Sequence, residues 1–459
     1  MPTPGSASLT VLMIHVDNKP ANLGESGWNA ILPPRQAHCT LAQDIDCDYL
    51  VVGAGFAGLA AARRLGQLEA GAGIVIIEAE QVAAGPAGRN SGFMIDLPHA
   101  IASGSYAGED SQDLRNIRMN RAAIAFAAEI ALSFGFPDEA FDPCGKINAA
   151  ASDVGSKHNA DYARHLDTLG EPYELLDASA MQAICGSNYY CGGLRTPGTA
   201  VIQPALYIRS FADALVENRV CQLYENSALQ ELSRKGDRWV AKTATGSVTA
   251  SRVILAVNGL IETFGFYRHR LMHINLYASM TRELSSAEVD ELGGRERWGF
   301  TPSDPIGSTV RRIDGSGGPR LVIRNKCTYE PSLRLPTDRL QRIARDHERT
   351  FYARFPMLKQ VEMEYCWSGR LCLSRNEVWA LDELETGLFS ACCQNGLGTT
   401  RGTIAGIVAA EMASDNRAPS LVPDYRPEAI PQRLFPEPFM TLGARGVIKF
   451  KEWQAGKEL

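Results

Sequence analysis

A glycine fingerprint near the N-terminus constrains this chain more than any other feature. The apolar, β-branched run 49–52 leads directly into Gly53, Gly55 and Gly58, and good helix formers follow at 59–65. In such a strand–turn–helix, the first glycine permits the tight turn, the second lets a pyrophosphate approach the backbone, and the third lets helix and strand pack closely. The segment therefore predicts a dinucleotide-binding βαβ unit, with the phosphates at the helix N-terminus.

An acid follows at the distance that this unit requires. The second predicted strand, 74–78, ends in Glu78, 20 residues after Gly58. A carboxylate there accepts hydrogen bonds from ribose hydroxyls and disfavours a 2′-phosphate, so NADP is the poorest fit. All five features, the strand, the glycines, the helix, the second strand and the acid, follow one another at the spacing of a dinucleotide-binding unit. A chance glycine triplet would not be accompanied by the others.

A loop beyond the acid suits a ligand that continues past the ribose. Residues 84–96 are rich in Gly, Pro and Ser, and Arg89 offers a partner for a pyrophosphate, with Asn90 and Ser91 as short polar neighbours. A solvated surface loop with one exposed arginine is an equally good interpretation of the same residues. The loop alone does not decide between FAD and NAD.

A second glycine-rich junction favours FAD. The apolar strand predicted at 388–393 leads into the turn 394–402 and the helical run 403–412, without the dinucleotide spacing. A helix N-terminus there suits the flavin ring, which gains negative charge on reduction, whereas a nicotinamide gains none. An ordinary helix cap by Thr399 or Thr400 is compatible with this role.

Motifs in several parts of the chain together resemble the D-amino-acid oxidase superfamily of flavoproteins. The similarity is to the branch of glycine oxidase, monomeric sarcosine oxidase and γ-glutamylputrescine oxidase, and it runs over nearly the whole chain. The motifs that carry it are Gly85–Gly92, Cys144-Gly-Lys-Ile, Ile202-Gln-Pro, Val253–Gly259, Trp367-Ser-Gly-Arg370 with Asn395–Thr400, and Pro436–Gly443.

This resemblance implies an α/β protein, α+β overall, in which a Rossmann-like FAD-binding domain is interleaved with an antiparallel-sheet substrate domain. It is consistent with the helical pattern at 117–134 and the strand-like patterns at 271–281 and 321–329. The implied ranges are 1–44 for an N-terminal arm, partly flexible at its start, 45–98, 200–263 and 367–420 for the FAD-binding domain, 99–199 and 264–366 for the substrate domain, and 421–459 for a C-terminal tail.

The resemblance also implies FAD contacts at residues of the matched motifs. Sarcosine-oxidase-like members link a Cys covalently to the flavin, but Gly369 aligns there and Cys372 lies three residues on, so FAD is predicted to be noncovalent. The expected contacts are Gly53, Gly55, Phe56, Ala57, Gly58, Glu78, Ala79, Gly88, Arg89, Asn90, Ser91, Ala228, Asn258, Gly259, Gly369, Arg370, Gly396, Leu397, Gly398, Thr399 and Thr400.

Substrate residues are harder to predict. Met94 and Tyr277 are the catalytic candidates, although core packing explains either equally well. Tyr277 and His273 lie on a predicted substrate-domain strand and are candidates to bind substrate. A substrate carboxylate would favour an arginine fork, for which Arg312 and Arg324 are candidates, each with a solvated charge as the alternative.

The implied reaction is oxidation of the C–N bond of a small amine or amino acid. A hydride passes from the carbon beside a neutral amine to flavin N5, the imine hydrolyses, and electrons go to oxygen or another acceptor. The lysine that promotes reaction with oxygen in relatives aligns near Val322, with Lys326 close by, which leaves the acceptor open. Two alternatives remain: a 2-hydroxy acid or glycerol phosphate dehydrogenase, and an accessory FAD subunit of a hetero-oligomeric, opine-oxidase-like complex.

Composition excludes several other classes. A net charge of −6 without basic blocks argues against nucleic acid, and no apolar run is long enough for a membrane span. The 8 His and 11 Cys show no metal-ligand spacing, and a disulfide framework is improbable in a chain of 459 residues. The N-terminus does not match a secretory signal, so we expect a cytoplasmic protein; the oligomeric state is not predicted.

Overall fold

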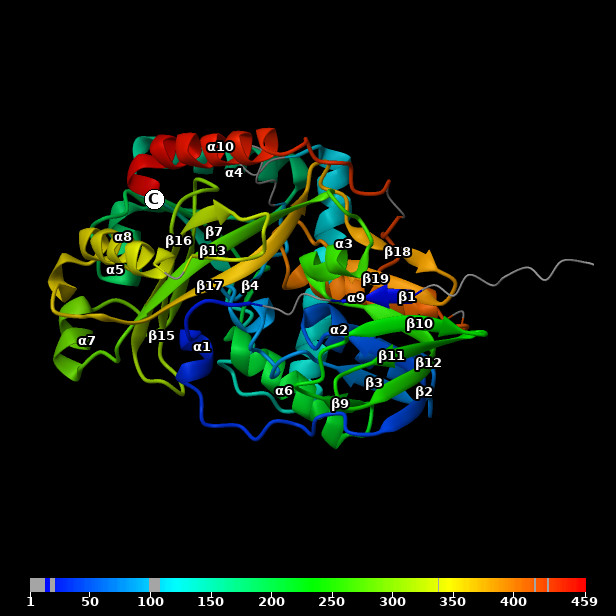
Figure 1. Ribbon diagram of the computed structural model, residues 1–459. Coiled ribbons are helices and arrows are strands. Elements are labelled where there is room, and N and C mark those ends of the chain that lie inside the picture. Colours follow the sequence, from blue (N-terminus) through cyan, green and yellow to red (C-terminus); the bar gives the residue numbers. More distant parts are fainter. Residues whose placement is uncertain (1–12, 17–20, 99–107, 337, 417, 427–428) are drawn as a thin grey trace, which may run out of the picture.

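Two large β-sheets organise the computed structural model, which describes residues 13–16, 21–98, 108–336, 338–416, 418–426 and 429–459 (Figure 1). The start of the predicted N-terminal arm and the beginning of the predicted segment 99–199 lie outside these ranges. Among the described residues, no helix is both long and apolar enough to cross a membrane.

The first sheet has nine strands and contains the glycine fingerprint. Its strands are β1 (Met13–His15), β2 (Asp44–Val52), β3 (Ile74–Ile77), β9 (Gln222–Tyr224), β10 (Glu231–Lys235), β11 (Arg238–Lys242), β12 (Ser247–Leu255), β18 (Ala380–Glu385) and β19 (Leu388–Cys392). The centre is parallel, in the order β12–β2–β3–β9, and β19 pairs parallel with the second half of β12. This parallel core, built from three distant parts of the chain, is typical of a dinucleotide-binding sheet.

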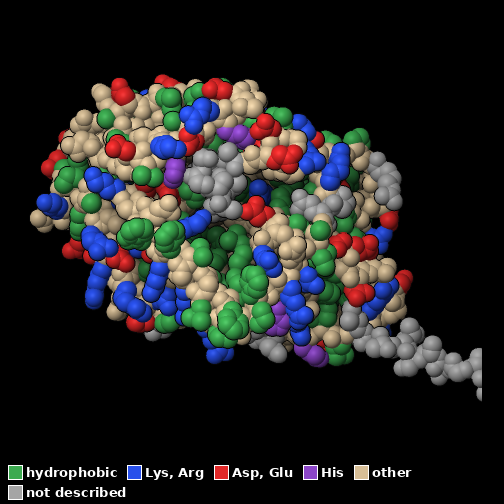
Figure 2. Space-filling view, turned by 90° about the horizontal axis from the view of Figure 1, so that it is seen from above, with side chains coloured by type: hydrophobic (Ala, Val, Ile, Leu, Met, Phe, Trp, Pro, Cys, Tyr) green, Lys and Arg blue, Asp and Glu red, His purple; other side chains and the backbone are tan. Residues whose placement is uncertain are grey.

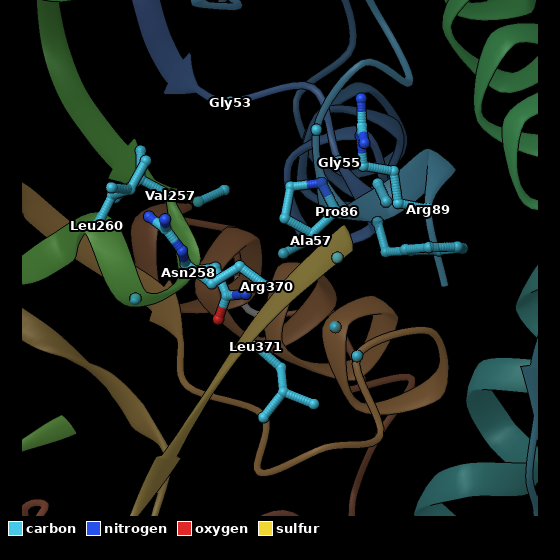
Figure 3. A pocket seen from close by; sticks show the side chains of 18 of the residues that line it. Gly53, Gly55, Ala57, Pro86, Arg89, Val257, Asn258, Leu260, Arg370 and Leu371 are labelled. Atoms are coloured by element: carbon cyan, nitrogen blue, oxygen red, sulfur yellow. The ribbon is translucent and has the colours of Figure 1, made fainter. Parts of the chain in front are cut away.

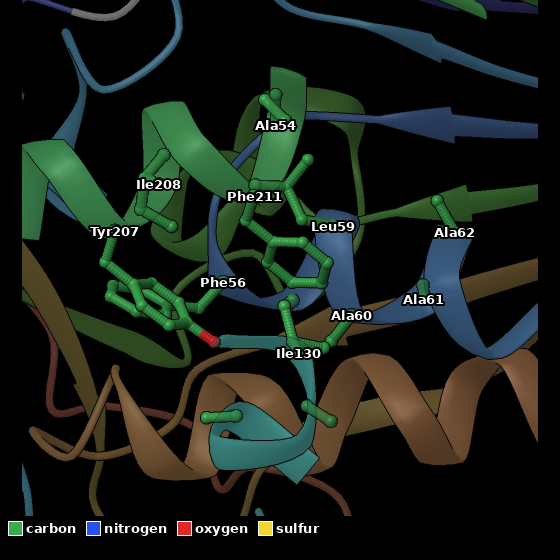
Figure 4. Close-up of a cluster of buried hydrophobic side chains, with 14 of the residues drawn as sticks. Ala54, Phe56, Leu59, Ala60, Ala61, Ala62, Ile130, Tyr207, Ile208 and Phe211 are labelled. Carbon is green, nitrogen blue, oxygen red and sulfur yellow. The ribbon is translucent and has the colours of Figure 1, made fainter. Parts of the chain in front are cut away.

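Two helices with small residues pack beside this sheet. They are α2 (Phe56–Leu68), which follows the fingerprint, and α9 (Thr400–Ala413), which follows the second glycine-rich turn. A Cβ on Gly406 would lie 2.1 Å from the carbonyl oxygen of Ala57, so only glycine lets the two helices approach this closely. Figure 4 shows α6 (Pro204–Glu217) closing the cluster, with Tyr207 and Phe211 packed over the start of α2.

The second sheet has eight strands in the order β17–β13–β16–β15–β14–β5–β7–β6. Their bounds are β5 (Lys146–Ala150), β6 (Glu174–Asp177), β7 (Gly192–Thr196), β13 (Leu271–Thr281), β14 (Trp298–Pro302), β15 (Thr309–Ile313), β16 (Arg320–Tyr329) and β17 (Met363–Ser374). The predicted strands 271–281 and 321–329 are confirmed as β13 and β16. The sheet is antiparallel, as expected, except between β14 and β5, where Phe300 pairs with Ile147 in parallel.

One strand crosses a predicted domain boundary. β17 spans 363–374 and pairs along its length with β13, so residues 367–374 belong to the second sheet although the sequence assigns them to an FAD-binding segment. A small two-stranded sheet, β4 (Phe93–Met94) with β8 (Ala200–Val201), lies where the chain passes from one layer to the other. The other domain ranges stay predictions.

The remaining helices cover the sheets. The predicted helix 117–134 is the C-terminal part of α3, whose last residue is Ser133. The other bounds are α1 (Gly27–Ala30), α3 (Asp110–Ser133), α4 (Asp153–Leu169), α5 (Ala178–Cys185), α7 (Ser286–Leu292), α8 (Arg339–Arg354) and α10 (Phe439–Ala455), with 3-10 turns η1 (Pro86–Gly88), η2 (Asn258–Phe264), η3 (Pro356–Leu358) and η4 (Gly456–Glu458).

The described parts of the N-terminal arm and of the C-terminal tail pack against the body. Trp28 in the N-terminal arm is fully buried and donates its indole N–H to the carbonyl oxygen of Asn90, 2.9 Å away. The predicted C-terminal tail forms α10, which lies along the outside of the second sheet at the top of Figure 1. The arm therefore supports the loop at 84–96, which the sequence connects with FAD.

Candidate functional site

Residues of both sheets line a cavity of about 770 Å³. Figure 3 shows three distant segments meeting there: Gly53, Gly55 and Ala57 of the fingerprint, Val257 and Asn258 after β12, and Arg370 and Leu371 of β17. Most of the residues predicted to contact FAD are among those that line it, namely Gly53, Gly55, Phe56, Ala57, Glu78, Ala79, Arg89, Asn90, Ser91, Ala228, Asn258, Gly259, Gly369, Arg370, Gly396, Leu397, Gly398 and Thr399.

The fingerprint glycines take the positions that their spacing predicts. Gly53 has φ +105°, in the region that favours glycine. A Cβ on Gly58 would lie 1.8 Å from the Gly53 carbonyl oxygen, so Gly58 packs helix against turn and does not line the cavity. At Gly55 the nearest atom to such a Cβ is 3.5 Å away, and no side chain caps α2. The first N–H groups of α2 are thus available to an anion.

Glu78 is held at the end of β3 by backbone amides. Its carboxylate accepts hydrogen bonds from the N–H groups of Ala54 at 2.8 Å and Glu80 at 3.1 Å. Burial raises the pKa of this carboxyl, and the two amides act in the opposite direction. Because each carboxylate oxygen has two lone pairs, Glu78 retains acceptor capacity for the hydroxyls of a ribose.

The loop after β3 is fixed mainly by backbone contacts. The Arg89 guanidinium donates to the carbonyl oxygens of Ala84 at 2.6 Å, Gly24 at 3.0 Å and Ser368 at 3.2 Å, and burial lowers its pKa. Arg89 lines the cavity, but these bonds make it a tie between the N-terminal arm, the loop and β17. Gly88 is not among the residues that line the cavity; a Cβ there would be 2.1 Å from the Ala83 carbonyl oxygen, so glycine lets the loop close on itself.

The second glycine-rich turn brings another helix N-terminus to the cavity. Gly396, Leu397 and Gly398 line it, and the Thr399 hydroxyl donates to the Phe93 carbonyl oxygen at 2.6 Å instead of capping α9. Thr400 is buried just behind the lining residues, and among the described residues its hydroxyl has no hydrogen-bond partner. An uncapped N-terminus beside an unpaired buried hydroxyl fits the electron-rich edge of a flavin.

Cys372 lies behind the cavity wall. Its thiol donates to the Asn258 side-chain oxygen at 3.0 Å, and its pKa is raised by a hydrogen bond with Cys393 and by burial. Gly369 lines the cavity three residues earlier, and no cysteine is among the described residues that line it. The residues present therefore fit a noncovalently bound FAD.

Tyr277 and Arg324 bring substrate-domain side chains to the same cavity. Tyr277 on β13 is fully buried, its hydroxyl lies 2.7 Å from the Thr328 hydroxyl, and burial raises its pKa. Arg324 on β16 lines the cavity near Thr301 and Thr309. Of the sequence candidates for substrate binding, these two are the ones that the structure places at the cavity.

The other three candidates are placed elsewhere, which corrects the sequence analysis. Met94 is buried in the core, because strand alternation points Phe93 and Ile95 to the cavity instead. His273 lies beneath η2, where its Nε2 is 2.7 Å from the Glu262 carboxylate. Arg312 points away from the cavity and donates to the Gly293 carbonyl oxygen at 2.6 Å.

Sequence reasoning missed a polar chain that leads away from the cavity. Thr301 lines the cavity and donates to the Asn148 side-chain oxygen at 2.7 Å, and the same oxygen accepts a hydrogen bond from Lys146. Lys146 is fully buried, and burial lowers its pKa to about 8. Thr301 and Lys146 lie on β14 and β5, which pair with each other, and no local motif marks either position.

It also missed a buried arginine. Arg311 donates to the carbonyl oxygens of Ser91 at 3.0 Å and Ile202 at 2.7 Å, and its guanidinium lies 5.0 Å from the Trp28 ring centroid. Burial lowers its pKa to about 10. Across the described ranges, no three His, Cys, Asp or Glu side chains gather as metal ligands.

Comparisons with known proteins agree with this geometry. The family described as FAD dependent oxidoreductase (DAO) matches residues 48–412. The γ-glutamylputrescine oxidoreductase of Escherichia coli (strain K12) is 26% identical over 387 residues, which cover 79% of this chain and 82% of that protein. The probable oxidoreductase OrdL of Rhizobium meliloti (strain 1021) is 24% identical over 366 residues, covering 76% of this chain and 79% of the relative.

Solved structures show the same fold. The glycine oxidase of Geobacillus kaustophilus has a TM-score of 0.65 at 16% identity and covers 82% of this chain and 96% of its own. The L-amino acid deaminase of Proteus vulgaris has a TM-score of 0.62 at 14% identity, covering 86% and 99%. The family match spans well over half of the chain, including both glycine-rich turns. The chain therefore belongs to the DAO family of FAD-dependent oxidoreductases.

Proposed function

We propose that this enzyme oxidises the C–N bond of a small amine or amino acid that carries a carboxylate. The observation that carries the proposal is Arg324, a cavity-lining cation on the sheet opposite the fingerprint. A guanidinium binds a carboxylate through two parallel hydrogen bonds, which fixes both position and orientation. The γ-glutamylputrescine oxidoreductase and glycine oxidase relatives, by their names, act on amine and amino-acid substrates.

FAD, which the turns at Gly53 and Gly396 and the Glu78 carboxylate would hold, would supply the redox chemistry for oxidising the carbon beside the substrate's neutral amine. Hydrolysis of the oxidised substrate by water would give a carbonyl compound and an amine or ammonia. The residues of this chain need only bind and orient the substrate. Of the described residues that line the cavity, the one histidine is His15, on the same side as Glu231 and Lys242 and far along the chain from Tyr277. This lining agrees with a reaction that needs no strong side-chain base.

Tyr277 and Thr301 would form the polar wall around the substrate. The Tyr277 hydroxyl is already bonded to Thr328, so its ring is held in one orientation. The Thr301 hydroxyl is likewise held by Asn148. Side chains with locked orientations keep a small substrate in one pose, which favours reaction at one carbon.

The electron acceptor is open to experiment. Val322, which aligns near the oxygen-activating lysine of relatives, is buried, and Lys326 forms an ion pair with Glu452 at 3.1 Å, away from the cavity. No lysine lines the described part of the cavity next to Tyr277 and Arg324. We therefore propose that oxygen is a slow acceptor and that a quinone or a carrier protein is the faster one.

Anaerobic bleaching of the flavin tests the proposal. The purified protein is mixed with sarcosine, glycine, D-amino acids, polyamine conjugates and opines, and the flavin absorbance is followed before air or a quinone is admitted. We expect a carboxylate-bearing amine to bleach the flavin, and Arg324→Met to lower kcat/KM for that substrate by roughly 10- to 100-fold. A matched loss with a carboxylate-free amine would contradict the assigned role of Arg324.

The products separate this proposal from its two alternatives. Amine oxidation releases ammonia or an alkylamine together with a carbonyl compound. A carbonyl product from a hydroxy acid or glycerol phosphate, without any amine, would instead identify a C–O dehydrogenase. FAD that is bound but reduced by none of these compounds would identify an accessory subunit.

A further inference from the structure

Helix α10 presents its apolar side to solvent, which is the reverse of a normal surface helix. Phe439, Leu442, Gly446, Phe450 and Trp453 follow one another at intervals of three or four residues and so share one face. We call these five residues the apolar stripe. The exposed fractions are 72% for Phe439, 67% for Leu442, 59% for Phe450 and 78% for Trp453.

This exposure is concentrated in one place. Every Phe or Trp among the described residues that is more than half exposed lies between 435 and 453. Single exposed apolar residues are ordinary on protein surfaces, whereas a contiguous row of aromatic side chains marks a surface that binds something. Trp453 lies 14 positions after Phe439, so the row extends about 21 Å.

The helix is nevertheless fixed to the body by its other side. Glu452 forms an ion pair with Lys326 of β16 at 3.1 Å. Just beyond the helix, the Glu458 carboxylate is buried and accepts hydrogen bonds from the Ala151 N–H at 2.9 Å and the Ser152 hydroxyl at 2.6 Å. Because both contacts hold the inner face against the second sheet, the apolar stripe stays outward.

The charges beside the stripe are all positive. From the spacing of about 100° per residue around the helix, Arg445 and Lys449 lie along one side of the stripe, whereas Lys451 lies toward the inner face. The one acid within α10, Glu452, lies on the inner face with its lysine partner. In a chain whose net charge is −6, α10 is therefore a local basic and aromatic ridge. Figure 2, which looks down on this face, shows exposed apolar side chains with Lys and Arg among them.

We propose that α10 docks this enzyme on the surface of an anionic lipid bilayer. A helix that lies in the headgroup region has Trp, Phe and Leu on one face and Lys and Arg beside it, which is the arrangement of α10. The cations reach anionic headgroups while the stripe enters the boundary with the acyl chains. A protein partner fits less well, because hot spots sit in pockets, whereas α10 lies along the outer edge of the molecule (Figure 1).

Vesicle flotation with the full FAD-loaded protein tests the proposal. We expect the protein to float with vesicles that contain phosphatidylglycerol, to float much less with phosphatidylcholine alone, and to be released by salt. Trp453 fluorescence should shift to the blue and be quenched by brominated lipids, which cannot reach the buried tryptophans. Failure to float with phosphatidylglycerol vesicles at low salt would overturn the proposal.

Variants separate docking from folding. F450S/W453S should lower vesicle partitioning by about 100-fold, and Lys449→Glu by about fivefold or more, with unchanged flavin absorbance and thermal unfolding. Leu132→Ser on α3 is the matched control, since Leu132 is 85% exposed and distant in sequence, and it should leave partitioning unchanged. If F450S/W453S instead changes the oligomeric mass of the free protein and not its flotation, α10 is a protein interface and the proposal is wrong.

Discussion

The two sheets bury opposite kinds of residue. Beside the nine-stranded sheet, the contacts that matter are made by Gly58 and Gly406, where any side chain would meet a carbonyl oxygen within about 2 Å. In and beside the eight-stranded sheet, the interior holds the cationic or titratable side chains of Lys146 on β5, Arg311 on β15 and His347 on α8. In the first region, glycines allow helices and turns to pack closely. In the second, buried polar side chains are stabilised by hydrogen bonds that offset their desolvation.

Burial shifts the pKa of each of these three side chains of the second region. It lowers the pKa of Lys146 to about 8, of Arg311 to about 10 and of His347 to about 4, because desolvation disfavours the charged form. Each of these side chains is held by oxygen atoms, and no carboxylate of the described residues lies within ion-pair distance of any of them. The comparison predicts that steric changes damage the first region and that charge or pH changes damage the second.

Gly58→Ala should have the largest effect. A Cβ at 1.8 Å from the Gly53 carbonyl oxygen cannot be relieved by a side-chain movement, so helix and turn must separate. We expect a loss of at least about 5 kcal/mol, enough to prevent the folded, FAD-bound state in a protein of ordinary stability. Flavin absorbance per protein measures the loss of bound FAD, and thermal unfolding measures the loss of stability. Gly446→Ala on α10, where the added Cβ meets nothing, is the control and should be neutral or slightly stabilising.

Gly55→Ala sharpens the same comparison. The added Cβ makes only an ordinary contact of 3.5 Å within the protein, but it enters the cavity where the pyrophosphate is expected. The variant should therefore fold and lose FAD, separating the two glycine roles that the fingerprint combines. Equal damage from Gly55→Ala and Gly58→Ala would contradict this division.

The same difference explains what the sequence could predict. The fingerprint, Glu78 and the turn at Gly396 were predictable because short spacings determine their geometry, and the structure brings all of them to one cavity. Arg311 and Arg312 are adjacent on β15, and only the sheet decides that Arg311 faces the FAD loop while Arg312 faces away. Which face a strand residue takes depends on pairing partners far along the chain, so His273, Met94 and Arg312 were misplaced.

Arg311→Met should have the second largest effect. It leaves the carbonyl oxygens of Ser91 and Ile202 without their donor and removes the cation that lies over the Trp28 and Phe93 rings. We expect a loss of about 4 kcal/mol in the free energy of unfolding, and weaker FAD binding because the loop at Ser91 is released. The neighbouring Arg312→Met loses one such bond, to Gly293, and should cost about 1 kcal/mol. Urea unfolding measures the loss in the free energy of unfolding for each variant. Equal losses would show that burial in this sheet, and not the number of carbonyl contacts, determines the destabilisation.

Of the stability effects predicted for Gly58, Arg311 and His347, that of His347 should be the smallest, and it should appear as a dependence of stability on pH. Its Nδ1 lies 2.7 Å from the Ser279 hydroxyl, and burial lowers its pKa from 6.5 to about 4. Since the unfolded chain takes up this proton near pH 6.5 and the folded one near pH 4, the stability that His347 contributes is complete above 6.5 and is lost as the pH falls toward 4. The loss amounts to about 3 kcal/mol. Burial raises the pKa of Glu78 in the first region, so acid acts there with the opposite sign.

His347→Gln isolates this effect, because it keeps a polar group beside Ser279 and does not titrate in this range. Urea unfolding of both proteins at a series of pH values measures their free energies of unfolding. The value for the unchanged protein minus that for His347→Gln should be constant above pH 6.5 and should fall by about 3 kcal/mol as the pH approaches 4. Taking the difference removes the titration of the surface carboxylates, which both proteins share. A difference that stays constant across the series would mean that His347 has the same pKa in the folded and unfolded chains, so that burial on α8 does not disfavour its charged form.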